Sequence, residues 1–251
     1  MSASMKRPDT YPAYAGVADC EMGESKASAA AYDYMRRGFV NKVFGLLAAQ
    51  LALTVLIAAP MVAVPAVKGF VTANPWLVSL ASMGGLVLIL VLSFSEHARH
   101  SHPTNLLLLA AFTALEGVVV GAVSSTYDTR AVALAAAATA GVAGALSAYA
   151  ARTKTDYTAQ GGALLTALVA LIFTGLLGAL TRSTALELAI AGGGALLFGW
   201  YLVFDVQMLI GGQHTRFQLS PDDYVAGAIA LYLDVINLFL YILRLLGNDR
   251  E

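Results

Sequence analysis

The sequence has few charged residues and almost no cysteine. Of its 251 residues, 12% are charged and 58% are hydrophobic, and its single cysteine is Cys20. Soluble domains carry about 25% charged residues, so one water-soluble core could not bury this much apolar surface. A single cysteine excludes an intramolecular disulfide and any metal site built from cysteines. The formal net charge of -1 gives no basis for nucleic-acid binding. The composition therefore predicts an integral membrane protein.

Catalytic motifs and a signal peptide are also missing. There is no GxSxG, HExxH or Walker motif, and no GxGxxG between a strand and a helix. We therefore expect neither an enzyme activity nor a cofactor. The first 42 residues contain no continuous apolar stretch of the kind found in signal peptides, so the first spanning helix should also act as the targeting signal. Residues 1–38 are rich in Ser, Ala, Pro, Tyr and charge, which predicts a largely disordered tail.

Long hydrophobic runs fill the remainder of the chain. A helix needs ~20 apolar residues to cross a bilayer, and seven runs are close to that length: 43–66, 76–95, 104–125, 131–151, 161–181, 185–210 and 222–246. Pro60 and Pro65 indicate that the first run kinks or ends early. The sequence thus predicts an all-α fold with seven transmembrane helices in a membrane domain of residues 39–246. Residues 247–251 would form a short C-terminal tail.

The lysines and arginines are unevenly distributed between the two ends of these helices. Ten lie in the N-terminal segment and in the second, fourth and sixth loops, against five on the opposite side. Cytoplasmic segments carry the excess of basic residues in membrane proteins. The N-terminus is therefore predicted to be cytosolic, with the C-terminus on the other side after seven crossings.

Two of the apolar runs contain a lone aspartate near the middle, Asp205 and Asp234. A carboxylate at the centre of a spanning helix costs roughly 2.5–3.5 kcal/mol on insertion scales, and such residues usually face a partner, a protein interior or water. Asn237 and Tyr241 follow Asp234 at helical spacing, so the last helix has a polar stripe through an apolar body. This pattern favours a central position for the last helix.

The two aspartates lie at different distances from the loop that joins their helices, so their side chains can come together only under certain conditions. Helices six and seven are antiparallel neighbours joined by a short loop, so each aspartate is the nearest partner for the other. At 1.5 Å per residue, Asp205 lies only ~10 Å from the loop end of its helix, and Asp234 lies ~20 Å from Ser220. The pair can meet only if helix six continues to about Gln213 or if helix seven protrudes further into the cytosol.

A carboxyl pair in an apolar interior has a defined chemistry. Two carboxylates in one low-dielectric site cannot both ionise cheaply, so they share a proton. Asp205 and Asp234 would then form a latch that is closed while the proton bridges them and loosened when both are charged. Oxygen ligands also suit Ca²⁺, which makes the same pair a candidate transient Ca²⁺ site. The alternative is that each aspartate separately binds backbone or a buried Tyr or Asn and stabilises helix packing.

Other charged and small residues have narrower interpretations. Glu116, in the third run, either belongs to the same polar interior or anchors its helix to another. Arg99, in the loop between the second and third runs, either faces lipid headgroups or turns inward and neutralises one of the acids. Gly117 and Gly121 form a GxxxG pattern, which lets spanning helices approach closely.

Six stretches of the chain form a recognisable pattern: FVNKVFGLLAAQLALT (39–54), SHPTNLLLLAAFTALEG (101–117), SSTYDTRAVALAAAATA (124–140), RTKTDYT (152–158), YLVFDVQMLIGG (201–212) and SPDDYVAGAIALYLDVINLFLYILRLL (220–246). In these stretches the sequence resembles the transmembrane BAX inhibitor motif family, and its lifeguard branch is the most similar. The resemblance covers about residues 36–246, and the last two stretches are the most specific.

This resemblance implies a seven-helix membrane fold in which six helices surround a central last helix in two layers. It also implies a pH-sensitive Ca²⁺ leak across an internal or plasma membrane, linked in eukaryotes to suppression of cell death. The paired aspartates of the family fall on Asp205 and Asp234, and its acid in the third helix falls on Glu116. Where the family carries a basic residue near the end of helix two, this chain has a Ser/His-rich loop containing Arg99.

Two other functions remain open at this stage. The first is a non-conducting regulatory protein that binds other membrane proteins, either as a cell-death regulator or as a modulator of a membrane protease; the glycine-rich helix faces and the N-terminal segment favour it. The second is a proton-coupled transporter. Transporters often contain inverted repeats, and the two halves of this sequence show no convincing repeat. The expected partners are membrane lipids, Ca²⁺ and other membrane proteins.

Overall fold

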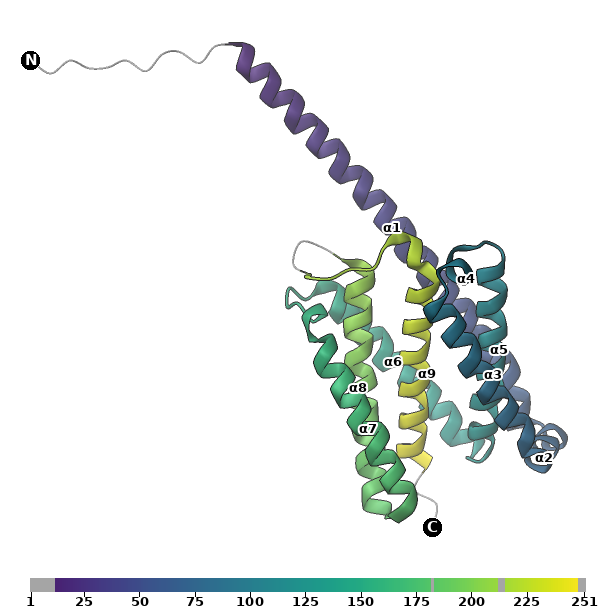
Figure 1. Cartoon of the computed structure of the whole chain (residues 1–251). Helices are drawn as coiled ribbons and strands as arrows, with labels where there is room; N and C mark the ends of the chain where they lie inside the picture. Colours follow the sequence, from purple (N-terminus) through teal and green to yellow (C-terminus); the bar gives the residue numbers. More distant parts are fainter. Residues whose placement is uncertain (1–11, 182, 212–214, 248–251) are drawn as a thin grey trace, which may run out of the picture.

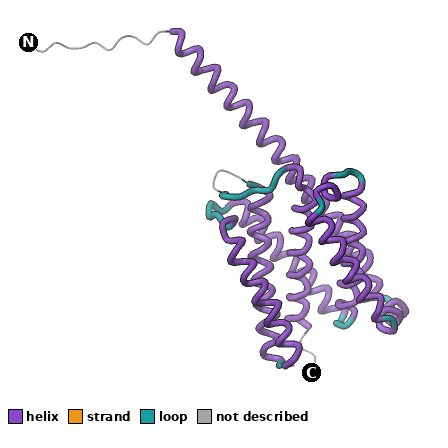
Figure 2. Tube along the Cα trace, viewed as in Figure 1, coloured by secondary structure: helices purple, strands orange, loops and turns teal. Residues whose placement is uncertain are grey.

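The computed structural model describes residues 12–181, 183–211 and 215–247, and the regular structure in these residues is helical (Figures 1 and 2). The elements are α1 (Pro12–Ala63), α2 (Pro65–Ala73), α3 (Pro75–Phe94), α4 (Glu96–His100), α5 (Thr104–Ser125), α6 (Thr129–Arg152), η1 (Thr158–Gln160), α7 (Gly161–Thr181), α8 (Thr184–Ile210), η2 (Pro221–Asp223) and α9 (Tyr224–Gly247).

Seven of these helices are long and apolar enough to cross a membrane. The candidate spans are 34–63, 75–94, 104–125, 129–152, 158–181, 184–210 and 221–247. They match the seven predicted runs in number and order. The prediction of an all-α protein with seven spanning helices is therefore confirmed.

The first helix begins much earlier than the sequence analysis predicts. α1 starts at Pro12 and runs for 52 residues, so the part of the predicted tail from residue 12 onward is helical. This segment contains the run Ala29–Ala31, and alanine is the strongest helix former. The prediction of disorder gave too much weight to polar composition. Residues 1–11 of the predicted tail lie outside the described part of the chain. In Figure 1 the first part of α1 projects away from the other helices.

Proline residues set the far end of α1. Pro60 lies within its last turn, the helix ends at Ala63, and Pro65 begins α2. Proline lacks the N–H that a continuing helix needs but is well accommodated at a first helical position. The early end predicted for the first run is therefore confirmed.

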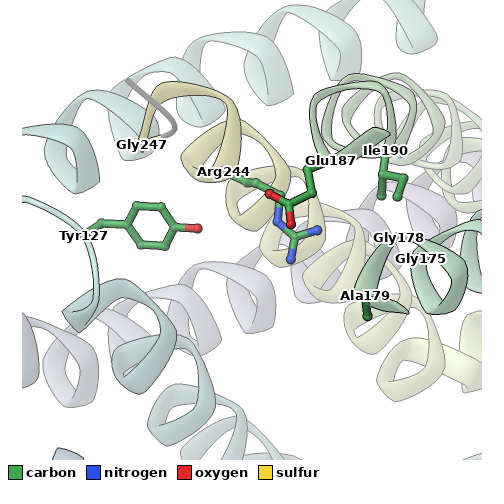
Figure 3. A pocket seen from close by; sticks show the side chains of 8 residues that line it. All are labelled: Tyr127, Gly175, Gly178, Ala179, Glu187, Ile190, Arg244 and Gly247. Atoms are coloured by element: carbon green, nitrogen blue, oxygen red, sulfur yellow. The ribbon is translucent and has the colours of Figure 1, made fainter. Parts of the chain in front are cut away.

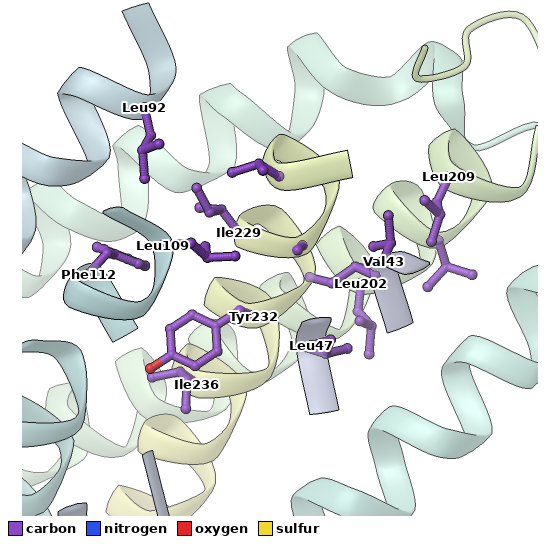
Figure 4. Packing of buried hydrophobic residues seen from close by; sticks show 14 of the residues in the cluster. Val43, Leu47, Leu92, Leu109, Phe112, Leu202, Leu209, Ile229, Tyr232 and Ile236 are labelled. Atoms are coloured by element: carbon purple, nitrogen blue, oxygen red, sulfur yellow. The ribbon is translucent and has the colours of Figure 1, made fainter. Parts of the chain in front are cut away.

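The last helix packs against four others: α1, α5, α6 and α8. Figure 4 shows Tyr232 and Ile236 of α9 beside Leu109 and Phe112 of α5 in the main cluster of buried apolar side chains. The rings of Phe112 and Tyr232 meet edge to face, with centroids 6.0 Å apart. α9 thus joins the α1–α3–α5 side of the bundle to the α6–α8 side (Figure 1). The complete two-layer enclosure by six helices stays a prediction.

Hydrogen bonds between buried polar side chains cross this apolar core. The Thr54 hydroxyl of α1 donates to Gln50 O at 2.9 Å, so the Tyr232 hydroxyl is the donor in its 2.8 Å bond to Thr54. Gln50 Nε2 donates to Thr113 of α5 at 3.1 Å. Buried polar groups are costly unless paired, and these bonds join α1 to both α9 and α5.

Replacing Tyr232 with phenylalanine is expected to lower the free energy of unfolding by about 1 kcal/mol, because the change removes one buried hydrogen bond and little volume. The measurement is unfolding of the purified protein in a mixed-detergent titration. Tyr149→Phe is the matched control, because the Tyr149 hydroxyl contacts Tyr157 at the protein surface. Equal stability of Tyr232→Phe and the unchanged protein would contradict a stabilising role for the Thr54 bond.

Candidate functional site

The ends of α8 and α9 determine whether the two aspartates can meet. α8 ends at Ile210, with Gly211 following at φ +66°, so helix six stops short of Gln213, which lies outside the described residues. The other condition is met instead, because helix seven begins beyond the end of helix six. A Cβ placed on Gly227, in the first turn of α9, would lie 3.6 Å from Leu209 Cδ1 near the end of α8. α9 and the preceding η2 therefore start beyond the end of α8.

This offset removes most of the difference in depth. Counted from the contact between Leu209 and Gly227, Asp205 lies ~6 Å along α8 and Asp234 lies ~10 Å along α9, at 1.5 Å per residue. The remaining difference of ~4 Å is within the reach of two carboxyl side chains. The protrusion of α9 is thus what brings the aspartates to a common level.

The carboxyl groups of Asp205 and Asp234 face each other as hydrogen-bond partners. Asp234 is buried, with 4% of its surface exposed, and Asp205 is partly buried. Among the described residues, no conventional donor reaches Oδ2 of Asp234. Ionised carboxylates can only accept hydrogen bonds, so a bond between the two groups requires a proton on one of them. The structure thus brings the two predicted carboxyl groups together at the α8–α9 interface, and proton sharing between them stays a prediction.

Tyr201 belongs to the surroundings of this pair, although the sequence analysis did not identify it. It lies close enough to both carboxyl groups to interact with them electrostatically. Its position four residues before Asp205 puts the two side chains on the same face of α8. This spacing of four residues is the sequence feature from which Tyr201 could have been predicted to lie near the pair.

The polar residues that follow Asp234 in the sequence make other contacts. Asn237 donates to the backbone oxygen of Leu233 in its own helix, at 2.8 Å. The Tyr241 ring stacks on Phe198, with centroids 5.7 Å apart, and packs where Gly194 leaves room on α8. Asn237 therefore bonds within α9, and Tyr241 packs against α8. Both residues lie on the C-terminal side of Asp234.

Glu116 faces a different helix from the aspartates. Its Oε1 atom lies 3.1 Å from the point where a Cβ on Gly85 of α3 would stand. Because Gly85 has no side chain, the carboxyl group fits into the α3–α5 contact. Glu116 also lies within electrostatic range of Tyr232 on α9, so both interpretations left open by the sequence stay predictions.

Arg99 does not neutralise the aspartate pair. It lies on the short helix α4, where its Nε atom is 4.0 Å from Oδ1 of Asp223, and His100 Nε2 is 3.3 Å from the same oxygen. Ser95 caps α4 by accepting from the Ala98 amide, which holds Arg99 at the end of the bundle. Arg99 therefore does not turn inward toward the aspartates, but lies beside Asp223 of η2, just before α9.

Gln207, two residues after Asp205, stabilises the end of α8 and is not part of the pair. Its side chain is buried; Oε1 accepts from the Tyr157 amide at 2.8 Å, and Nε2 donates to Thr155 O at 2.9 Å. These bonds attach the loop between α6 and η1 to α8.

A cavity of about 350 Å³ lies at the opposite end of the bundle (Figure 3). It is lined by Tyr127, Gly175, Gly178, Ala179, Glu187, Ile190, Arg244 and Gly247. Glu187 is exposed in the first turn of α8, where an acidic side chain interacts favourably with the helix dipole. This cavity is separate from the aspartate pair, which lies nearer the other end of α8 and α9.

Comparison with known proteins identifies the family. Residues 36–251 match the family model described as "Inhibitor of apoptosis-promoting Bax1". The chain belongs to this Bax inhibitor family. The predicted family relationship is therefore confirmed, and the matched region contains all seven candidate spans in whole or in large part.

Relatives of this Bax inhibitor family chain come from a virus, an animal and a plant. The Golgi anti-apoptotic protein of Vaccinia virus (strain Lister) is 36% identical over 228 residues, covering 91% of this chain and 92% of the viral protein. Protein lifeguard 4 of Mus musculus is 37% identical over 241 residues, covering 95% and 97%. A BI1-like protein of Arabidopsis thaliana is 37% identical over 238 residues, covering 91% and 89%.

Proposed function

We propose that this protein is a pH-sensitive Ca²⁺ leak channel of a cellular membrane, gated by Asp205 and Asp234. The observation that carries the proposal is the contact between the two carboxyl groups across the α8–α9 interface. The contact joins two spanning helices and needs a proton to form. A change in its protonation can therefore change the packing of those helices.

The electrostatics of the pair give the direction of the pH response. With one proton shared, the carboxyl groups attract and hold α8 to α9. When that proton is lost, two charges ~4 Å apart repel by about 4 kcal/mol at an effective dielectric constant of about 20. Separation of the helices or binding of a divalent cation relieves this repulsion. The leak should therefore increase as the pH rises through the titration of the pair, with Ca²⁺ as the ion that the carboxylates bind transiently.

The cellular setting is part of the same proposal. The excess of basic residues supports a cytosolic N-terminus. One relative carries Golgi and anti-apoptotic in its name, which supports an endomembrane location and a role in suppressing cell death. A plasma-membrane location remains the alternative. In either membrane, the leak would contribute to calcium homeostasis.

A second candidate is a non-conducting regulator that binds other membrane proteins, as a cell-death regulator or a membrane-protease modulator. The observation in its favour is the open space beside several glycines of the spanning helices. Side chains built on Gly141, Gly144, Gly162 or Gly175 would meet nothing within 4 Å. Such positions allow another spanning helix to approach closely.

The deciding experiment measures Ca²⁺ release from liposomes that contain the purified protein, over a range of pH. We expect Asp205→Asn and Asp234→Asn each to lose the pH response, because an asparagine cannot exchange the proton. Glu96→Gln is the control, since Glu96 is an exposed acid outside the membrane spans. Flux that keeps its pH response in both aspartate variants would exclude this gate. Absence of flux in the unchanged protein, together with a specific co-purifying membrane protein, would favour the second candidate.

A further inference from the structure

Arg36 of α1 makes an unusual set of contacts near the end of α8. Its side chain is buried, with 7% of the residue exposed. Nε donates to Ile210 O at 3.0 Å, Nη2 donates to Met208 O at 2.8 Å, and Nη1 donates to Leu219 O. A single guanidinium therefore binds two carbonyls at the end of α8 and one carbonyl in the segment that leads into α9.

Described residues at both ends of the α8–α9 connection lie close to this guanidinium. Leu219 N donates back to Met208 O at 2.8 Å, which closes the loop. Gly211 turns with φ +66°, and a Cβ there would lie 2.9 Å from Nη2 of Arg36. Tyr32, one turn before Arg36 on α1, donates to Gln218 Oε1 at 3.0 Å. Two residues of α1 thus hold both sides of the same loop.

The contacts of Arg36 depend on the planar geometry of its guanidinium group as well as on its positive charge. Among the side chains that the structure describes, no carboxylate pairs with Arg36. Its partners are backbone carbonyls, two of which belong to a helix end where carbonyls lack partners within the helix. A cation is favourable at that end, but the guanidinium spreads its N–H donors over three nitrogens in a rigid plane, whereas a lysine ammonium places its three donors on one nitrogen. Lysine would keep the charge and lose part of the geometry.

We propose that Arg36 is the positioning residue that sets the axial register of α8 against α9, and through it the contact between Asp205 and Asp234. Met208 lies about one turn beyond Asp205, and Leu219 lies two residues before η2, which leads directly into α9 and Asp234. A slip of one helical turn would move one carboxyl group by about 5.4 Å along its helix and separate the pair. The consequence for calcium flux rests on the proposed function, but the consequence for the register does not.

The experiment compares Arg36→Gln, Arg36→Lys and the control Arg37→Gln, in the full-length protein. Arg37 is the adjacent arginine and is exposed, so its variant makes the same change in charge without touching the loop. The first measurement is hydrogen exchange of the Gly211 and Leu219 amides, both of which bond to carbonyls of α8. We expect at least tenfold faster exchange in Arg36→Gln, a smaller increase in Arg36→Lys and no change in Arg37→Gln.

The second measurement is the pH dependence of Ca²⁺ release from liposomes. Arg36→Gln should move its midpoint to lower pH, because a pair held in poorer register retains its proton less well, and Arg36→Lys should give an intermediate midpoint. Unchanged exchange in Arg36→Gln would overturn the proposal, as would a lysine variant identical to the unchanged protein in both measurements. If Arg36→Gln does not fold, the lysine variant provides the same test. If the unchanged protein passes no Ca²⁺, the exchange rates still decide the role of Arg36, and only the channel proposal fails.

Discussion

Replacing Gly121 with leucine is expected to lower the free energy of unfolding by about 3 kcal/mol, the upper end of the usual cost of overpacking. A Cβ at this position would lie 2.9 Å from the Cα atom of Ala58 on α1 and 2.5 Å from Sδ of Met61. The methionine side chain can move, but the backbone of α1 can shift only by separating the α1–α5 interface. The measurement is the unfolding titration in mixed detergent.

Gly141→Leu is the matched control for this prediction. Gly141 lies on the spanning helix α6, and a side chain built on it would meet nothing within 4 Å. Both substitutions carry the same change in helix propensity, which favours leucine over glycine. Gly141→Leu should therefore leave stability unchanged or raise it slightly. Similar losses in the two variants would show that contact with α1 is not the reason for glycine at position 121.

Replacing Asp234 with leucine is expected to cost about 2 kcal/mol, because Asp205 then loses its hydrogen-bond partner at a partly buried position. Adding Asp205→Leu to that variant should cost less than Asp205→Leu costs alone, since no carboxyl group is then left unpaired. The expected interaction energy in this double-mutant cycle is about 1–2 kcal/mol, as found for residues in one hydrogen-bonded network. The measurement is unfolding of the four proteins at one pH.

A second cycle provides the control. Thr166 lies on α7, is exposed, and bonds only locally to Gly162 O. Asp234→Leu combined with Thr166→Val should be additive within about 0.5 kcal/mol, as for independent sites. Additive behaviour in the Asp205 cycle as well would mean that the two aspartates act separately. The packing alternative considered from the sequence would then replace the shared-proton pair.

The spanning helices could be predicted from sequence because the bilayer imposes a length and an apolar composition on each of them. The runs predicted at 104–125 and 161–181 coincide with α5 and α7. The helices α6, α8 and α9 depart from prediction by at most two residues at either end. The helix in the segment before the first span could not be predicted in this way, because the bilayer does not constrain that segment. Its helix propensity had to be weighed against a polar composition that is typical of disorder.

The site could be predicted only in part. Asp205 and Asp234 stand out because a carboxyl group within an apolar run needs a partner. Their contact depends on α9 starting beyond the end of α8, which the loop sequence does not specify. Arg36 gave no signal, since an arginine at the start of a spanning helix is ordinary for a cytosolic end. For Arg99 the sequence left two orientations open, toward lipid headgroups or toward the acids, and the structure places it beside Asp223 instead.

The amino-acid sequence by itself determined that this is a seven-span helical membrane protein of the Bax inhibitor family with two aspartates and a glutamate, Glu116, inside its apolar helices. These features follow from local composition, because the bilayer constrains each spanning helix separately. Only the tertiary structure decided which groups those acids and the basic residues meet. Such contacts depend on where helices end and how they slide along each other, and a shift of one turn, about 5.4 Å, is enough to exchange one partner for another.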